Sequence, residues 1–340
     1  MRRVLVLFLM VAVLAVLDGR LAAAPDNRVV VVCSPDPDWC ELVKAEFSRI
    51  AGVQLEYLRL SAGEALARLR AERQNPTFDV WFGGTGDPHF VAATEGITEF
   101  YRPKAWKDLR AELTRVTDGK YIPLYTGLHG LAVNDALLAD KKAAAPEKWT
   151  DLGNAGYRNL VATPNPGTSG TGYLFVTTRV SIYGEDRAFD ILKRVHRNVA
   201  QYTRSGGAPS LLAGRGEVAI GVSFGNDVAG RKVSGFKIRF VAPSDGVAAE
   251  IGGLSLIKGT ARRDNAIRFI DWALTPEAQS LGHRALSFDV PSNANTPVPI
   301  FVPKFEDAKV IKYDYNKFGT PDVRERLLKR WDAEVSTAPK

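Results

Sequence analysis

The stretch "DVWFGGTGDPHF" (79–90) governs the interpretation of the whole chain. An apolar strand expected over 78–82 ends in a glycine-rich turn, and a helix is expected from Pro88 onward. The glycines do not have the G-x-G-x-x-G spacing, and the sequence contains no G-x-x-x-x-G-K-[ST] run, so a nucleotide site is not supported. The turn is instead a candidate wall of some other binding site.

Strands and helices alternate before this turn. The pattern predicts a strand over 28–32, a helix over 38–50, a strand over 52–60 and a helix over 61–73. Ser61 and Glu64 have the spacing of a capping box at the start of the second helix. Such alternation indicates a parallel sheet covered by helices.

The second half continues the alternation between two strand-like segments, 125–134 and 252–259, which are interpreted as crossings between lobes. The other predicted features are a helix start at 149–152, a strand, turn and helix over 159–184, an amphipathic helix over 185–199, a turn, helix and strand over 201–227, a strand over 237–243, and a helix pair broken at Thr275 and Pro276. A chain of 340 residues exceeds the ~250–300 at which single cores usually divide, so two lobes are expected.

Residues 1–24 are predicted to be a signal peptide. Arg2 and Arg3 are basic, 4–17 is apolar, and 22–24 is a run of alanines suited to cleavage. The apolar run is shorter than the ~18 residues of a membrane span, although a signal anchor is the alternative. We therefore expect a mature periplasmic or secreted protein that begins near Pro25.

The charge pattern argues against a nucleic-acid partner. The full chain has a net charge of +7, and loss of three arginines and one aspartate with the leader would leave +5. No block of Lys and Arg stands out, and no second apolar run is long enough to span a membrane. The mature protein is expected to be soluble, with a weak attraction for anionic ligands.

The two cysteines, Cys33 and Cys40, lie close together in "CSPDPDWC". An even, local pair in an exported protein predicts one disulfide that closes a small loop. A structural zinc site would need four ligands, and no histidine lies near this pair in the sequence.

A strand, a short Gly/Ser/Thr turn and a helix start recur five times, at 34–38, 61–63, 83–87, 167–172 and 203–208. The free N–H groups and partial positive charge of each helix start could hold an anion, although a Ser or Thr there often only caps the helix. Sheets of this class bind ligands at the carboxyl ends of their strands, so the five turns together predict a shared anion site.

Acidic and amide side chains lie at similar positions: Asp87, Asn226, Asp227 and Glu250. Facing hydroxyl groups, they would suit a polyol that carries a charged group. The alternatives are a helix N-cap for Asp87 and simple surface exposure for Asp227 and Glu250. A secreted hydrolase using the last two carboxylates is a further alternative, but any two carboxylates meet that description. No G-x-S-x-G or H-E-x-x-H motif occurs, so no catalytic residue is assigned.

Together these segments resemble the periplasmic solute-binding proteins of ABC importers, of the type 2 (class D) fold and the iron(III)-type family. The segments that carry the resemblance to the sub-branch of hexose-phosphate-binding members are "CSPDPDWC", "SAGEALARLRAE", "DVWFGGTGDPH", "NPGTSGTGY", "QYTRSGGAPS", "AIGVSFGND" and "EIGGLSLIKG". The resemblance implies an α/β fold of two lobes, each a mainly parallel sheet flanked by helices, with the ligand cleft between them. Lobe 1 would comprise 25–124 and 251–340, and lobe 2 would comprise 125–250.

Departures from the family pattern affect the ligand. Iron-binding members carry a Tyr-Tyr pair where this chain has Ser223 and Phe224, so a ferric-ion-binding protein is only the alternative. Tyr313 and Tyr315 are expected to pack on the surface of the tail. Sugar-phosphate members have a histidine where this chain has Asn226.

The resemblance implies capture of a small phosphorylated sugar or related polar organic anion by hinge closure, and delivery to a membrane ABC permease. No cofactor, metal or nucleic acid is implied, and a monomer is expected. The expected anion contacts are Ser34, Thr85, Gly86, Ser169, Gly170 and Thr171; the expected hydroxyl contacts are Asp87, Asn226, Asp227 and Glu250; Ser61, Thr203 and Ser205 are further candidates. Arg59 and Arg204 are possible charge partners of the anion, although a solvent-facing position is favoured for each.

Overall fold

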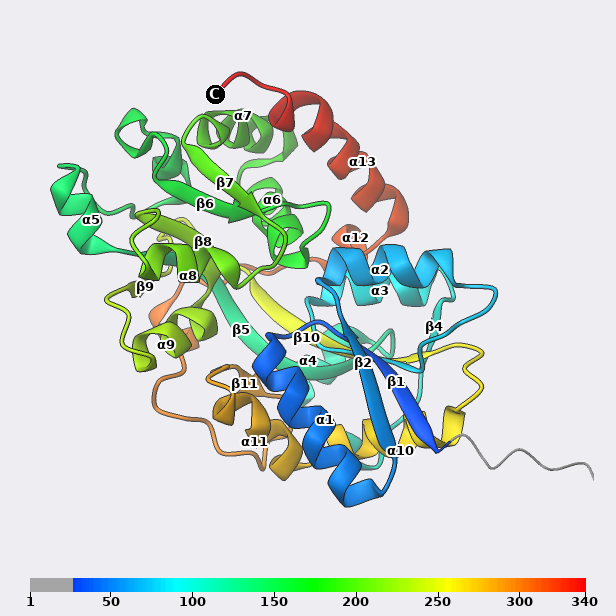
Figure 1. The fold of residues 1–340 in the computed structure, drawn as a ribbon. Coiled ribbons are helices and arrows are strands. Elements are labelled where there is room, and N and C mark those ends of the chain that lie inside the picture. The colour runs from blue at the N-terminus through cyan, green and yellow to red at the C-terminus, as the bar shows by residue number, and fades with distance from the viewer. Residues whose placement is uncertain (1–26) are drawn as a thin grey trace, which may run out of the picture.

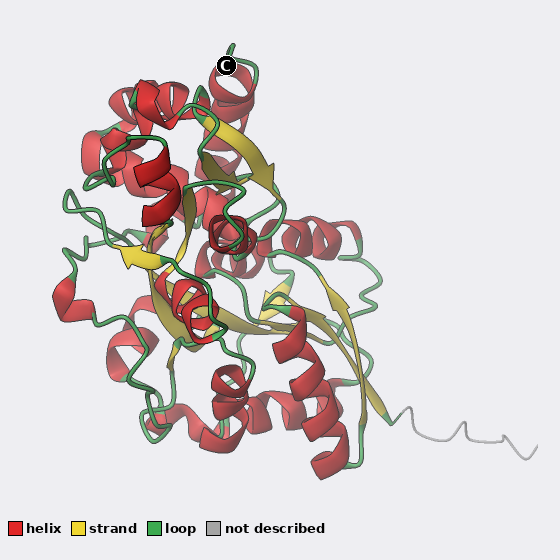
Figure 2. Cartoon of the chain, turned by 60° about the vertical axis from the view of Figure 1, so that its left-hand side comes forward, coloured by secondary structure: helices red, strands yellow, loops and turns green. Residues whose placement is uncertain are grey.

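The computed structural model describes residues 27–340, and the predicted signal peptide lies outside this range. The chain forms two α/β halves that share one connected sheet, with the strand order β2-β1-β3-β10-β5-β8-β6-β7 (Figure 1). Helices cover the outside of the strands in both halves (Figure 2). The predicted two-lobe α/β architecture is confirmed.

The first half is built as the alternation predicted. Its parallel strands are β1 (Arg28–Cys33), β2 (Gln54–Arg59) and β3 (Val80–Phe82), and its helices are α1 (Pro37–Ala51), α2 (Ala62–Ala71), α3 (Gly86–Thr94), α10 (Arg263–Ala273) and α11 (Pro276–Arg284). The capping box of Ser61 and Glu64 is present at the start of α2. Helix α3 begins two residues before the predicted Pro88.

Two long strands connect the halves. β5 (Ile122–Val133) is buried along its full length and runs antiparallel to β10 (Ala249–Ile257). β10 also pairs with β3 of the first half, while β5 pairs with β8 of the second half. The predicted crossings are therefore confirmed as the centre of the shared sheet.

The second half contains a parallel sheet of β6 (Val161–Pro164), β7 (Val199–Thr203) and β8 (Ile220–Phe224), with helices α6 (Gly170–Tyr183), α7 (Glu185–His196), α8 (Ala208–Gly214) and α9 (Gly225–Val233). β7 precedes the predicted turn at 203–208, although no residue range was predicted for this strand, and the predicted helix start at 149–152 is a single 3-10 turn. The remaining short elements are β4 (Thr98–Glu99), α4 (Ala111–Thr117), α5 (Asp135–Asp140), β9 (Arg239–Val241), β11 (Val290–Pro291) and α12 (Tyr315–Phe318).

The C-terminal helix α13 (Pro321–Trp331) lies beside α7 in the second half (Figure 1). Its Leu327 and Trp331 belong to the same buried cluster as Trp149 and Phe189. The predicted assignment of all of 251–340 to the first lobe is therefore wrong for this helix. Apolar residues one helical turn apart give α13 a stripe that needs a core to cover it, and the second half supplies that core.

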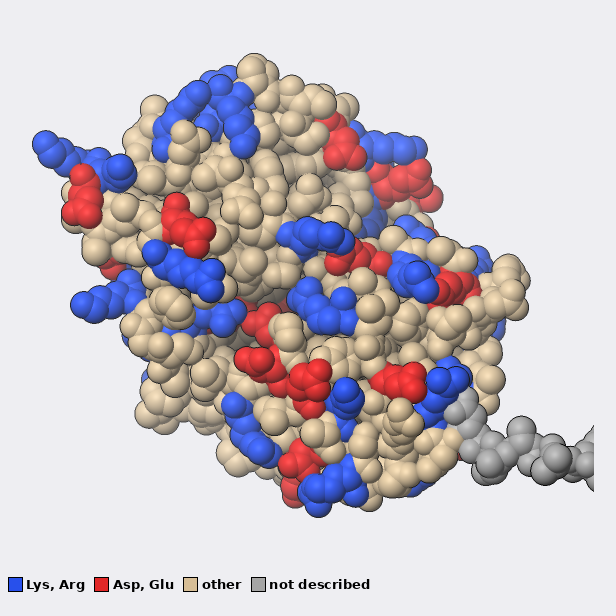
Figure 3. Space-filling model, viewed as in Figure 1, with Lys and Arg blue, Asp and Glu red and all other residues tan. Residues whose placement is uncertain are grey.

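Basic and acidic side chains are interspersed over the face of the molecule shown in Figure 3. Within 27–340, no helix is long and apolar enough to cross a membrane.

Candidate ligand-binding cleft

A polar cavity lies between the two halves, at the carboxyl ends of the strands. Nine of the predicted site residues line it: Ser34, Ser61, Thr85, Ser169, Gly170, Thr171, Asn226, Asp227 and Glu250. Four do not, namely Gly86, Asp87, Thr203 and Ser205. The recurring turns therefore meet at one cavity, although not every predicted residue faces it.

One end of the cavity is formed by three helix N-termini, which we call the donor pole. Ser61, Thr85 and Ser169 are the N-cap residues of α2, α3 and α6. The helix starts approach one another closely, since a β-carbon added at Gly170 would lie 2.9 Å from the β-carbon of Thr85 and 3.3 Å from that of Ala62. The hydroxyl of Thr85 is buried and has no hydrogen-bond partner among the residues described. Three partial positive charges and an unused hydroxyl thus converge on one point.

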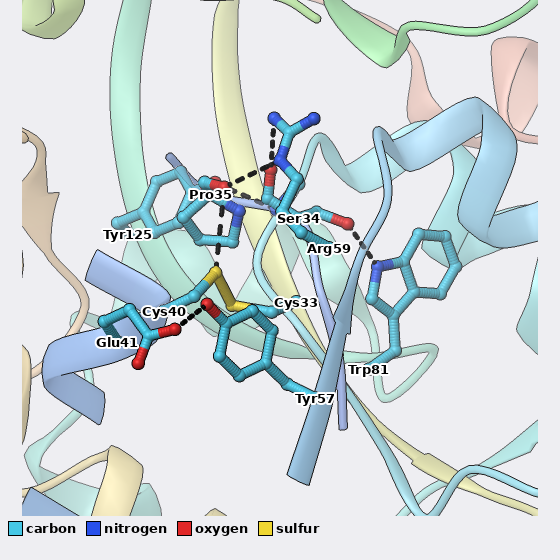
Figure 4. The surroundings of a disulfide bond; sticks show 10 residues. Cys33, Ser34, Pro35, Cys40, Glu41, Tyr57, Arg59, Trp81 and Tyr125 are labelled. Atoms are coloured by element: carbon cyan, nitrogen blue, oxygen red, sulfur yellow. Dashed lines mark hydrogen bonds between the residues drawn. A yellow bond between two sulfur atoms is a disulfide. The ribbon is translucent and has the colours of Figure 1, made fainter. Parts of the chain in front are cut away.

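A disulfide positions the loop beside the donor pole. The Cys33–Cys40 bond joins the end of β1 to the first turn of α1, as predicted. In Figure 4 it lies beside the loop that contains Ser34 and Pro35. The Ser34 hydroxyl accepts a 2.9 Å hydrogen bond from the indole of Trp81, so both its backbone and its side chain are held in place.

Arg59 does not occupy the solvent-facing position that was favoured for it. It is partly buried and lines the cavity, because its guanidinium donates to the carbonyl oxygens of Pro35 at 3.1 Å and Ser34 at 3.3 Å (Figure 4). The loop closed by the disulfide thus draws a cation toward the cleft. Arg204 is exposed, as predicted, and forms an ion pair with Glu64.

The other end of the cavity, which we call the acceptor pole, consists of Asn226, Glu250 and Asp289. Each has a buried side-chain oxygen without a hydrogen-bond partner in the described part of the chain. Burial raises the pKa of Asp289 to about 7 and that of Glu250 well above its usual range. Unmatched acceptors of this kind are costly to bury and suit a ligand that brings hydrogen-bond donors.

Asp227 caps α9 and also lines the cavity. Its Oδ2 accepts hydrogen bonds from the Ser223 hydroxyl at 2.6 Å and from the Phe224 backbone N–H at 3.3 Å. Burial, followed by the nearby Asp36, raises the pKa of Asp227 to about 6. Asp227 is half-buried and lines the cavity, so it is not the exposed surface residue of the alternative.

Asp87 lies behind the cleft instead of in it, and Thr85 takes the N-cap position that was the alternative for Asp87. Its Oδ1 accepts a 2.9 Å hydrogen bond from the Tyr313 hydroxyl, which also lies 2.7 Å from the hydroxyl of Thr177. Tyr315 is buried and Tyr313 is partly buried, so the expectation that they pack on the surface is wrong. The tail folds back across β10, where the Tyr315 hydroxyl accepts from the Ile251 N–H at 3.0 Å.

The other three predicted residues are also occupied elsewhere. The backbone of Gly86 packs so closely that an added β-carbon would lie 2.7 Å from the carbonyl oxygen of Ile251. The Thr203 hydroxyl donates to the Ser205 carbonyl at 2.8 Å, so this turn is held by its own atoms.

Several cavity residues were not singled out from the sequence: Asp36, Trp39, Tyr125, Ser287 and Asp289. Tyr125 accepts a 3.0 Å hydrogen bond from the N–H of Gly84, in the glycine-rich turn after β3. Asp36 was inside a predicted turn, whereas Asp289 follows α11 in a region without a recognisable pattern. The position of Asp289 at the cavity depends on the return of the chain to the crossing strands, where β11 pairs with β5.

The halves are in contact across the cleft. The Ser61 hydroxyl donates to the Arg204 carbonyl at 2.9 Å, and the Glu64 N–H donates to the Thr168 carbonyl at 3.2 Å. Arg231 Nη2 lies 3.0 Å from Asp36 Oδ2. These contacts close the cavity, and no group of three His, Cys, Asp or Glu residues within 27–340 is arranged to hold a metal ion.

Residues 77–317 match the family described as bacterial extracellular solute-binding protein. The chain belongs to this family. By its description, this is a family of binding proteins.

Similar proteins match between 76% and 93% of this chain. A Haemophilus influenzae protein is 36% identical over 324 residues, which cover 93% of each chain. The periplasmic binding protein AfuA from Actinobacillus pleuropneumoniae, solved with exogenous fructose-6-phosphate bound, is 32% identical with a TM-score of 0.88, over 92% of this chain and 99% of AfuA. A Salmonella typhi protein named "Putative 2-aminoethylphosphonate-binding periplasmic protein" is 26% identical over 276 residues, 76% of this chain and 78% of its own.

Proposed function

We propose that this protein is the extracytoplasmic binding component of an ABC importer and captures a small phosphorylated sugar or a related polar organic anion in the cleft. One observation carries the proposal: the N-termini of α2, α3 and α6 converge on a single cavity beside the unpaired hydroxyl of Thr85. Helix N-termini are favourable sites for phosphate, because their free N–H groups and their dipoles both point at the anion.

The donor pole would hold the phosphate largely with neutral groups. Backbone N–H groups and the hydroxyls of Ser34, Thr85, Ser169 and Thr171 donate hydrogen bonds, and the guanidinium of Arg59 adds one positive charge nearby. Such donors are fixed by the fold before the ligand arrives and are shielded from water, so they act strongly on a charged group.

The acceptor pole would bind the rest of the ligand. Hydroxyl or other N–H and O–H donors would satisfy the buried oxygens of Asn226, Glu250 and Asp289, while Asp227 lies beside them. The fructose-6-phosphate bound to AfuA has a phosphate at one end and hydroxyls at the other, and 2-aminoethylphosphonate belongs to the same broad class of small organic anions.

The transport cycle would follow from the fold. Export would remove residues 1–24 near Ala24, and the mature monomer would bind its ligand in the periplasm. The halves would close on the ligand about the crossing strands β5 and β10, and the closed form would dock on a membrane permease.

The ferric alternative is less well supported. Ser223 lies at the position of the family's first tyrosine, and its hydroxyl donates a hydrogen bond to the capping carboxylate of Asp227. The side chain of the neighbouring Phe224 has no atom that could bind iron. The phenols of Tyr313 and Tyr315 bond to Asp87, Thr177 and the backbone of β10, on elements behind the cavity. A hydrolase would need a nucleophile or a water-activating pair at the cavity, and Asp227 already caps α9.

A thermal-shift panel tests the proposal. Fructose 6-phosphate, glucose 6-phosphate, the two free sugars, inorganic phosphate and ferric citrate are each added to the mature protein. A ligand at 100 times its Kd stabilises by about 2.7 kcal/mol, and at least one phosphorylated compound is expected to do so. Stabilisation by free sugars but not by phosphates, or by ferric citrate alone, would contradict the proposal.

A matched pair of variants locates the phosphate. Thr85→Val removes the unpaired hydroxyl at the N-terminus of α3, whereas Thr94→Val makes the same change at the exposed end of that helix. The first is expected to weaken phosphate-dependent stabilisation and the second to leave it unchanged. An equal response to both variants would remove Thr85 from the site.

A further inference from the structure

Three unmatched oxygens meet at the acceptor pole. Asn226, Glu250 and Asp289 are 5%, 3% and 4% exposed, and one side-chain oxygen of each is without a partner in the part of the chain that is described. The amide oxygen of Asn226 is an acceptor, and the carboxyl oxygens of Glu250 and Asp289 are acceptors when these groups are ionised. The pole therefore has an excess of lone pairs and lacks donors to match them.

Two of the oxygens converge above a glycine in β5. A β-carbon added at Gly127 would lie 2.7 Å from Asn226 Oδ1 and 3.6 Å from Asp289 Oδ1. In the antiparallel pairing of the crossing strands, Gly127 is directly opposite Glu250. The absence of a side chain at 127 keeps this space open between the three residues.

The charges around this pole are predominantly negative. Burial is the main cause of the raised pKa of Glu250 and of Asp289; Asp289, Asp227 and Asp87 add to the first shift, and Asp227 and Asp36 add to the second. Arg231 is engaged by Asp36, and Arg59 is bonded to carbonyls of the loop beside the donor pole. Burial favours the protonated form of both carboxyls in the empty pole, and a bound cation would favour their ionised form, whichever way the amide of Asn226 is turned.

A hydroxyl and an ammonium group would not satisfy the acceptor pole equally well. A hydroxyl brings one donor and two lone pairs, so it adds acceptors to a place that already has too many. An ammonium brings three donors, no acceptor and a positive charge. Three unmatched acceptors, two of them acidic, correspond to the ammonium.

We infer that the ligand carries a protonated amine at the end opposite its phosphate or phosphonate, and that this amine donates to Asn226, Glu250 and Asp289. The substrate class is then a small amino-bearing phosphate or phosphonate, such as an amino-sugar phosphate or an aminoalkylphosphonate. The phosphate half of this statement rests on the proposed function, whereas the amine half rests on the acceptor pole alone.

Two ligand pairs that differ only in the amine test the inference by calorimetric titration of the mature protein. Glucosamine 6-phosphate is compared with glucose 6-phosphate, and 2-aminoethylphosphonate with ethylphosphonate. In at least one pair the amine is expected to bind tenfold or more tightly than its partner. If neither pair shows a preference for the amine, the inference is wrong, while binding of the phosphates would leave the proposed function intact.

Variants tie the preference to the pole. Asp289→Asn and Glu250→Gln remove a charge with little change in shape, and each is expected to reduce the amine preference at least fivefold. Asp140→Asn, on the exposed end of α5, is the matched control and should retain it. A preference that survives in both cavity variants would contradict the assignment of these residues.

Further results distinguish the proposed amine contact from the proposed phosphate contact. Free glucosamine binding as tightly as its 6-phosphate would support the amine and contradict the phosphate. Stabilisation by calcium alone, with competition against the amine, would overturn the inference in favour of a metal site. Failure of every compound to bind would contradict both proposals.

Discussion

The hydroxyl of Ser61 donates a 2.9 Å hydrogen bond to the carbonyl oxygen of Arg204, across the cleft between the two halves. Beside it, the N–H of Glu64 donates to Thr168, so the N-terminus of α2 lies directly against the opposite half. A residue that caps a helix in the donor pole therefore also takes part in closing the cleft. The same residues therefore serve ligand binding and closure of the cleft. A variant that hinders closure should also weaken ligand binding.

Gly63→Ala is expected to hinder closure without harming the fold. A β-carbon at this position would lie 2.5 Å from the carbonyl oxygen of Gly167 across the cleft. Overpacking of this kind costs about 1–3 kcal/mol, so ligand affinity should fall by about 5-fold to 150-fold. Alanine is a better helix former than glycine by about 1 kcal/mol, so the melting temperature of the free protein should not fall.

Gly156→Ala is the control for that change, because an added β-carbon there meets nothing within 4 Å. It should leave the Kd measured by titration calorimetry unchanged. An unaltered Kd for Gly63→Ala as well would show that α2 does not need to approach this closely for binding.

The ligand-free protein is expected to lose stability as the pH rises from 5 to 8. Burial raises the pKa of Asp87 and Asp289 to about 7 and that of Asp227 to about 6, against a usual value of 3.8. A carboxyl with a raised pKa stabilises the folded state while it is protonated, and this contribution disappears as pH passes through the folded-state pKa. For a pKa near 7, the loss over this range is about 3 kcal/mol per group.

Thermal melts at pH 5, 6, 7 and 8 measure this dependence, and Asp289→Asn should flatten it. The variant is expected to remove only part of the slope, because the buried Asp87 and the cleft residue Asp227 also have raised pKa values and remain in the protein. A melting temperature that rises between pH 5 and 8 would show that the buried carboxyls are ionised at low cost.

Reduction of the Cys33–Cys40 disulfide should affect both stability and binding. A loop of this size contributes about 2–3 kcal/mol by restricting the unfolded chain. Because the loop carries Ser34, which lines the cavity, the reduced protein should also bind its ligand more weakly. Melting curves and titrations with and without reductant measure the two effects. Unchanged affinity after verified reduction would separate the loop from the site.

Tyr313→Phe should lower stability and have little effect on affinity. Loss of its hydroxyl leaves the buried carboxyl of Asp87 without its 2.9 Å hydrogen bond, which costs about 1–3 kcal/mol. Neither residue lines the cavity, so the Kd should change less than about threefold. Denaturant unfolding and titration measure the two quantities, and a large loss of affinity with unchanged stability would restore Asp87 as a ligand contact.

The sequence indicates the donor pole because its signals are local. Ser61, Thr85 and Ser169 each stand between a strand or turn and a helix start, and such a position has the same meaning wherever the helix lies. The shared edge of the sheet then brings them together. The two-lobe architecture follows from the same alternation.

The remaining parts of the site depend on contacts between distant segments. Asp289 and Tyr313 lie in the last fifth of the chain, and only its return across β10 brings them to the cleft and to Asp87. Asp87 shows the limit of a local signal, since the sequence of a helix start does not tell which side chain faces the ligand. Arg59 was misplaced because the carbonyls that hold it belong to another strand's loop.

A crystal structure of the complex with the phosphorylated compound that stabilises the protein most tests the central claim directly. The account predicts phosphate oxygens within about 3.2 Å of the Thr85 hydroxyl and of backbone N–H groups at the starts of α2, α3 and α6. The other end of the ligand should then face Asn226, Glu250 and Asp289. A phosphate bound at that acceptor end, or outside the cavity, would contradict the account.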